Sequence, residues 1–153
     1  EEELLSALMS THMGGQDYPG DPVASPNWPG FGPGTWGPNN ALSPKYADDP
    51  KKLLNLAQKP PILWIRGADD PIVSDAGIGD MGNLGRAGYI PGWPGEDIFP
   101  PQPMIAQTRQ VLDAYQASGG MYTEVTLENC AHVPYLEKAD DFNAAFHAHL
   151  KKG

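Results

Sequence analysis

Residues 61–70 have the sequence Pro-Ile-Leu-Trp-Ile-Arg-Gly-Ala-Asp-Asp, in which a short apolar run ends at a glycine and two acids follow. An apolar run of this length, bounded by proline and glycine, is typical of a strand buried on both faces of a parallel sheet. The glycine lets the chain turn as it leaves the strand. The segment therefore predicts a strand that delivers a carboxylate at its carboxyl end, where open α/β sheets place their sites.

A second segment of this kind lies further along the chain. Residues 121–127 alternate and contain β-branched side chains, which predicts a strand, and the turn at 129–133 carries His132. Pro134 suits the first position of a helix that follows. Strand, helix, strand and helix in this order favour an α/β fold with parallel strands and right-handed crossovers.

The helix between the two strands is predicted over residues 103–119. Pro103 can occupy its first position, and the Gly-Gly pair at 119–120 ends it. Its buried stripe is expected to consist of Met104, Ile105, Thr108, Val111, Leu112 and Tyr115.

Asp70 and His132 are the candidate catalytic residues. A carboxylate that accepts a hydrogen bond from an imidazole fixes the ring's tautomer and stabilises the imidazolium. A histidine that titrates near neutrality can take a proton from a nucleophile and return it to a leaving group. Each signal alone also has a structural explanation, since acidic turns before proline are common and a lone histidine is more often structural. Asp69 and Asp75 are the next candidates for the acid.

These two segments resemble the C-terminal part of an α/β-hydrolase. Residues 61–73 resemble the acid-bearing strand and turn of that family, and residues 130–138 resemble its histidine loop and the start of its last helix. The family's acid commonly lies three residues beyond the strand-ending glycine, which selects Asp70 over Asp69. The resemblance implies an α/β fold in which residues 59–153 form the C-terminal half of the hydrolase core, with parallel strands and flanking helices.

The preceding residues 1–58 would then be a loop-rich remnant of the cap, or lid. Residues 14–44 are rich in glycine and proline and are predicted to form extended loop without a periodic element. A short helix is predicted from about residue 49 to 58.

Four tryptophan and phenylalanine side chains are candidates for substrate binding. Trp28, Phe31 and Trp36 interrupt the first glycine- and proline-rich stretch, and Trp93 lies in a second one at residues 77–101. Simple packing against the body of the protein is the alternative interpretation.

The family's nucleophile is missing, because no serine of this chain lies in a Gly-x-Ser-x-Gly turn. The chain also begins without methionine, in an acidic and helix-favouring segment. The resemblance therefore implies a serine esterase acting on small ester or acyl substrates, split or cleaved into a heterodimer. This chain would supply Asp70 and His132, and a partner chain or N-terminal half would supply the serine. The alternatives are an epoxide hydrolase or dehalogenase with an aspartate nucleophile, or a non-catalytic binding protein of the same fold.

Composition narrows the classes of partner that this chain is expected to bind. The net charge is −9 without a basic cluster, which argues against nucleic acid or an anionic membrane as partner. The single Cys130 excludes an internal disulfide and a cysteine-based zinc site. It fits a reducing compartment, so we expect a cytoplasmic location. No signal-peptide pattern is present, and no apolar run approaches the roughly 20 residues that span a bilayer.

No cofactor or metal is expected. Residues 77–82 match Gly-x-Gly-x-x-Gly, but Asp80 would place a negative charge beside a pyrophosphate, and no periodic helix is predicted to follow. His147 and His149 are two apart on a predicted helix and so point in roughly opposite directions, about 200° apart, which is poor geometry for sharing a metal.

Overall fold

The computed structural model describes residues 2–10 and 18–151 and divides the chain into two compact units, residues 1–48 and 49–153. The boundary predicted from the sequence lay between residues 58 and 59. The 3-10 helix η1 (Pro50–Asn55) replaces the predicted helix at 49–58, and it contacts helix α4 (Met104–Ala117) of the second unit. Residues 1 and 11–17 of the predicted cap lie outside the described residues.

A two-stranded parallel sheet organises the second unit. Strands β3 (Ile62–Gly67) and β4 (Tyr122–Leu127) pair in register from Ile62 opposite Tyr122 to Gly67 opposite Leu127. Both strands were predicted, and their parallel pairing is confirmed. Mixed α/β architecture follows, with one small parallel sheet flanked by helices.

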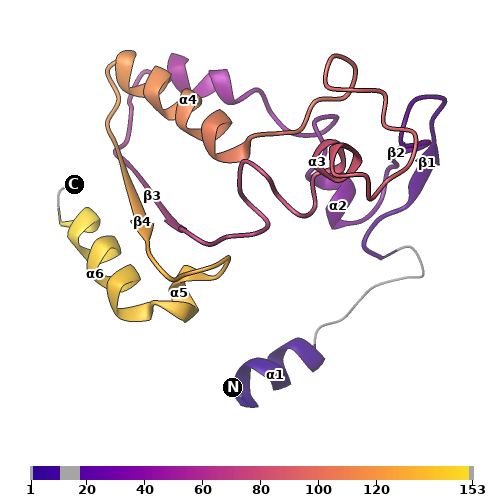
Figure 1. The fold of residues 1–153 in the computed structure, drawn as a ribbon. Helices are drawn as coiled ribbons and strands as arrows, with labels where there is room; N and C mark the ends of the chain where they lie inside the picture. The colour runs from indigo at the N-terminus through magenta and orange to yellow at the C-terminus, as the bar shows by residue number, and fades with distance from the viewer. Residues whose placement is uncertain (1, 11–17, 152–153) are drawn as a thin grey trace. The chain divides into compact units, whose positions relative to one another are not determined.

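Helices cover both faces of this sheet. Figure 1 shows α4 on one side of β3 and β4 and helix α6 (Ala139–Leu150) on the other. On the α4 side, Glu124 of β4 pairs with Arg109, and alternation along the strands places Ile65 and Val125 on the opposite face. The buried stripe predicted for α4 is confirmed, since all six of its residues are buried or half-buried. Tyr115 is fully buried, and its hydroxyl donates to the carbonyl oxygen of Pro60 at 2.6 Å.

The C-terminal helix is interrupted once. Pro134 begins helix α5 (Pro134–Glu137), as predicted, and Lys138 then leaves the helical region with φ −135° and ψ 52° before α6 begins. α5 and α6 contact each other, and both contact β3.

The sequence predicted no periodic helix after residues 77–82, and a helix of six residues begins within this segment. Helix α3 (Met81–Arg86) begins there, capped by the buried Asp80, whose Oδ1 accepts from the Gly82 amide at 2.9 Å. Its Oδ2 accepts from the Gln102 amide at 2.6 Å. A six-residue helix has too few turns to show a hydrophobic period, so its cap alone marked it in the sequence.

The prediction that residues 14–44 lack a periodic element was wrong. Strands β1 (Pro22–Ala24) and β2 (Phe31–Pro33) pair antiparallel, and helix α2 (Pro38–Ala41) follows them. Strands of three residues that contain proline carry no readable alternation. The remaining element of this unit is helix α1 (Glu2–Met9).

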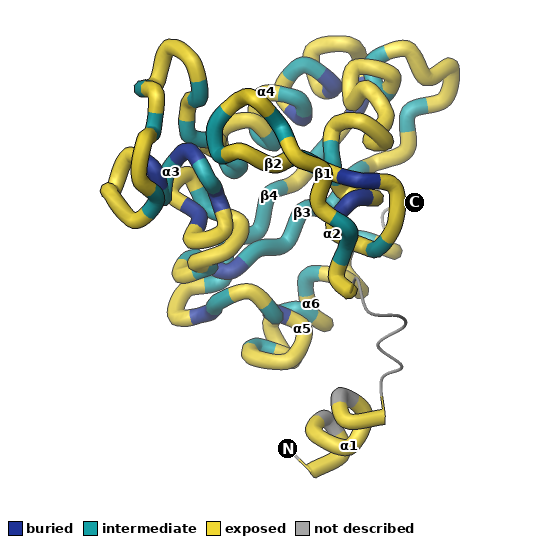
Figure 2. The backbone as a smooth tube through the Cα atoms, turned by 90° about the vertical axis from the view of Figure 1, so that its right-hand side faces the viewer, coloured by how far each residue is buried: buried dark blue, intermediate teal, exposed yellow. Residues whose placement is uncertain are grey.

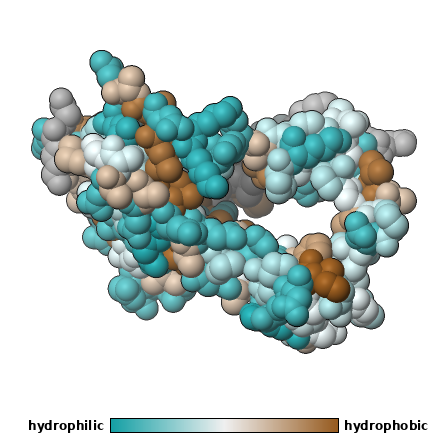
Figure 3. Space-filling view, turned by 90° about the horizontal axis from the view of Figure 1, so that it is seen from above, coloured by the Kyte–Doolittle hydropathy of each residue, from teal (hydrophilic) through white to brown (hydrophobic). Residues whose placement is uncertain are grey.

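The second unit encloses little of its apolar surface. Among the described residues, the buried apolar side chains are Leu112, Tyr115, Cys130 and Pro134. β3 and β4 are half-buried over most of their length, as Figure 2 shows, whereas parallel strands are normally covered on both faces. Apolar side chains also reach the surface between hydrophilic ones on the face drawn in Figure 3. Within the described part of the chain, each of these strands has one neighbour, so one edge of each is unpaired.

No helix formed by the described residues has the length and apolar character needed to cross a bilayer.

Candidate functional site

The turns that follow β3 and β4 bind each other through their backbones. The amide of Ala68 donates to the Leu127 carbonyl and the amide of Asp69 donates to the Cys130 carbonyl, both at 2.9 Å. Gly67 permits this approach, because a Cβ at that position would overlap the carbonyl oxygens of Cys130 and Ala131. The carboxyl ends of the two parallel strands are thereby held side by side.

The Asp70 carboxylate divides its hydrogen bonds between its two oxygens. Oδ1 accepts from the amides of Ile72 at 2.8 Å and Val73 at 3.0 Å, which fixes the carboxylate on its own turn. Oδ2 lies 2.9 Å from Nδ1 of His132. The predicted contact between Asp70 and His132 is therefore present.

The electrostatics of Asp70 favour its ionised form. Partial burial raises the pKa of this carboxyl, but the hydrogen bonds from His132, Ile72 and Val73 outweigh it, so the net pKa lies below the ordinary 3.8. A charged carboxylate at Nδ1 favours the tautomer that carries its proton on that nitrogen.

His132 is presented on the tight turn after β4. Asn129, with φ 51°, adopts the left-handed conformation that asparagine tolerates better than most residues. The His132 side chain is 46% exposed while that of Asp70 is 8% exposed. Nε2 makes no hydrogen bond to any residue that the structure describes. The arrangement can therefore accept a proton at Nε2 while Asp70 holds the opposite nitrogen.

The two alternative acids, Asp69 and Asp75, have other structural roles. Asp69 is exposed and takes part in the site through its backbone amide. Asp75 Oδ1 accepts from the Ala106 amide at 2.9 Å and thus caps the first turn of α4.

Sequence reasoning missed Glu137, at the end of α5. Its two carboxylate oxygens accept from the amides of Ala131 and Val133, the residues on either side of His132. An acid that binds backbone amides has no signature of its own, and only its position shortly after the histidine could have drawn attention to it.

The predicted substrate-binding aromatics fall in both units. Trp28, Phe31 and Trp36 belong to the first, where Phe31 is 50% and Trp36 45% exposed. Trp93 belongs to the second and donates from Nε1 to the Phe99 carbonyl at 2.9 Å. Substrate contact by these four residues stays a prediction.

Trp36 lines an open, mainly apolar hollow of about 410 Å³ in the first unit. The other lining residues are Thr35, Gly37, Ala41 and Tyr46.

No group of three or more histidine, cysteine or carboxylate side chains within residues 2–10 and 18–151 has the geometry of a metal site. His147 and His149 both lie on α6. Comparison with protein-family models, with curated proteins and with solved structures finds no match for this chain.

Proposed function

We propose that this chain supplies the acid and the histidine of a hydrolase of the α/β-hydrolase type, acting on small ester or acyl substrates. The observation that carries the proposal is the 2.9 Å contact between Asp70 Oδ2 and His132 Nδ1. It joins the turns after two neighbouring parallel strands, where this class of sheet places its sites.

In the proposed reaction, a serine hydroxyl supplied by other polypeptide attacks the acyl carbonyl. His132 Nε2 takes the hydroxyl proton and donates it to the leaving alcohol, which leaves the acyl group on the serine. His132 then takes a proton from a water molecule that attacks this ester, and returns it to the serine oxygen as the carboxylic acid is released. Asp70 holds the ring by Nδ1 and stabilises its charged form. Backbone amides of the same additional polypeptide would form the oxyanion hole.

The half-buried strands support the need for further polypeptide. The apolar side chains of β3 are left partly exposed, and a parallel sheet is normally extended and covered by its own chain or by a partner. We propose an N-terminal half of the hydrolase, carrying Gly-x-Ser-x-Gly, as the polypeptide that extends the sheet.

The proposal is tested on the protein isolated with any polypeptide that copurifies. A fluorophosphonate probe should label a serine outside residues 1–153, and hydrolysis of p-nitrophenyl acetate should accompany it. His132→Ala should abolish both, whereas His147→Ala, on the exposed side of α6, should leave them unchanged.

Two outcomes would overturn the proposal that the protein is a serine hydrolase. Absence of labelling together with release of halide from a haloalkane would establish an aspartate nucleophile instead. Absence of labelling and of any hydrolysis would favour the alternative of a non-catalytic binding protein.

A further inference from the structure

We infer that Glu137 is a positioning residue for His132: its carboxylate holds the peptide groups on both sides of the histidine and so fixes where the imidazole meets Asp70. This inference rests on the proposed function, because it assigns a supporting residue to the same site.

The geometry is a two-point clamp around a single residue. Oε2 of Glu137 accepts from the Ala131 amide at 2.8 Å, and Oε1 accepts from the Val133 amide at 2.9 Å. His132 is the one residue between these two donors. The main-chain amide of Glu137 also donates to the Val133 carbonyl at 2.9 Å, which closes α5 against the same turn.

The opposite side of the turn is held independently. The Cys130 carbonyl accepts from the Asp69 amide, and Gly67 packs against the backbone of Cys130 and Ala131. On the downstream side, the Val133 carbonyl accepts from the main-chain amides of Leu136 and Glu137 at 2.9 Å each, which holds Val133 at the start of α5. The Glu137 carboxylate adds the bonds that hold the amides of Ala131 and Val133, the N–H groups on either side of the histidine.

The clamp requires a carboxylate. Two N–H donors reach two different oxygens, and an ionised carboxyl group offers a charged acceptor at both without a hydrogen of its own. The hydrogen bonds from Ala131 and Val133 lower the pKa of Glu137 below the ordinary 4.5, against the opposing effects of burial and of Asp70. Glu137 is therefore ionised at neutral pH.

Glu137→Gln is the decisive substitution, because it keeps the length of the side chain and turns one acceptor into an NH₂ donor facing a backbone N–H. A positional shift at a catalytic group lowers turnover steeply, so kcat should fall roughly ten- to hundredfold with KM little changed. Long-range ¹H–¹⁵N spectra should show His132 changing from one tautomer to a mixture of two. This readout needs no activity.

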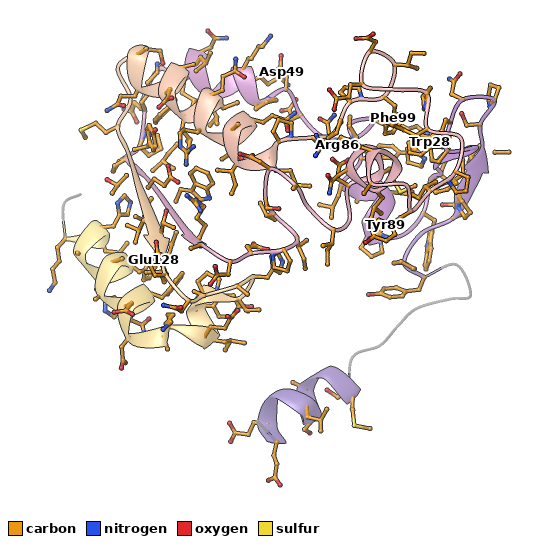
Figure 4. The ribbon with its side chains drawn as sticks, in the orientation of Figure 1. Trp28, Asp49, Arg86, Tyr89, Phe99 and Glu128 are labelled. Carbon is orange, nitrogen blue, oxygen red and sulfur yellow. The ribbon has the colours of Figure 1, made fainter. Side chains whose placement is uncertain are left out.

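Glu128→Gln is the matched control. Glu128 lies just beyond the carboxyl end of β4, where Figure 4 labels it, and it is exposed on the same loop as His132. The control should leave both kcat and the His132 tautomer unchanged. A single, unaltered tautomer in Glu137→Gln would overturn the inference.

A measurement on the unmutated protein decides the matter if Glu137→Gln does not fold. The amide proton shifts of Ala131 and Val133 should move together as the pH falls through the lowered pKa of Glu137, and the Glu128 amide should not follow them. Amides that ignore this titration would contradict the clamp. If the protein proves to hydrolyse nothing, the proposed function fails, while the tautomer and amide results still judge the role of Glu137.

Discussion

Asp21 in the first unit and Asp70 in the second are both aspartates that bind backbone amides at a turn, but they use their oxygens differently. Asp21 gathers its bonds on one atom: Oδ1 accepts from the Trp36 amide at 2.7 Å and from Nδ2 of Asn40 at 2.7 Å. The Thr35 amide also donates to Oδ1 at 3.0 Å and reaches Oδ2 only at 3.3 Å.

Asp70 instead assigns one oxygen to its own turn and the other to His132. The comparison teaches that a carboxylate whose hydrogen bonds converge on one oxygen stabilises a loop. A carboxylate whose second oxygen contacts an imidazole can also support proton transfer. The same substitution, aspartate to asparagine, should therefore have very different results at the two sites.

The largest effect is expected from Asp70→Asn. If the new NH₂ faces the amides of Ile72 and Val73, the bonds to the turn are lost, and if it faces His132, it donates to Nδ1 and stabilises the opposite tautomer of the ring. In the proposed hydrolase, kcat should fall by about four powers of ten, as expected when the histidine is left in the wrong tautomer. Steady-state hydrolysis measures this. Asp69→Asn is the control, and a loss below about tenfold at Asp70 would remove it from the mechanism.

Gly67→Ala should come next, because it tests the backbone approach on which the contact at Asp70 depends. The added methyl would meet the carbonyl oxygens of Cys130 and Ala131. We expect a loss of about 1–3 kcal/mol in unfolding free energy, as for other overpacked sites. Chemical denaturation followed by circular dichroism measures it. Gly79→Ala should be far milder, since nothing lies within 4 Å of a Cβ built there; equal effects would contradict the close approach at Gly67.

A smaller effect is expected at Glu124, which ties α4 to the strands that carry Asp70 and His132. Its carboxylate accepts from Arg66 and Arg109 at 2.8 Å each, and bonds from these two arginines, Arg109 foremost, lower its pKa from 4.5 to about 2 despite partial burial. Since the folded pKa is depressed, the stabilisation is complete above pH 4.5 and is lost as the pH falls toward about 2.

Glu124→Gln should therefore cost on the order of 1 kcal/mol near neutral pH, after allowance for solvent screening. It should also flatten the acid dependence of the midpoint in denaturant titrations between those two pH values. Glu128→Gln serves as the control. An acid dependence that persists unchanged in Glu124→Gln would show that another group causes it.

Asp21→Asn should have the smallest effect, in contrast to Asp70→Asn. The asparagine oxygen can take the place of Oδ1 and keep the bonds to Trp36 and Thr35. Hydrogen bonds, that from the Trp36 amide foremost, hold the pKa of Asp21 below its ordinary 3.8 against the effect of burial, so the native form gains stability above that pH and loses it on acidification. The variant should lose only this pH dependence. Hydrogen exchange at the Trp36 amide shows whether its bond to residue 21 is kept in the variant. Fast exchange of that amide at neutral pH would contradict the expected difference between Asp21 and Asp70.

The parts that the sequence predicted are those whose signals are local. β3 and β4 are recognisable because apolar or β-branched runs end at turn residues, and α4 because its stripe repeats over several turns. Asp70 and His132 stand just beyond the ends of these strands, so the order of the segments suggested their pairing, and the resemblance to α/β-hydrolases selected Asp70 over Asp69. The strands β1 and β2 and the helix α3 are too short for any period to emerge, and their prediction failed for that reason.

By itself, then, the sequence determined two parallel strands and which titratable side chain follows each of them. Only the tertiary structure decided that Gly67 must lack a side chain and that the Glu137 carboxylate accepts hydrogen bonds from the amides on either side of His132. Only the structure, likewise, gave Asp70 one oxygen for its turn and one for the imidazole. The physical reason is that hydrogen bonds to backbone amides and close backbone approaches depend on where two turns meet in space. The residue types of the two turns do not predict this meeting point.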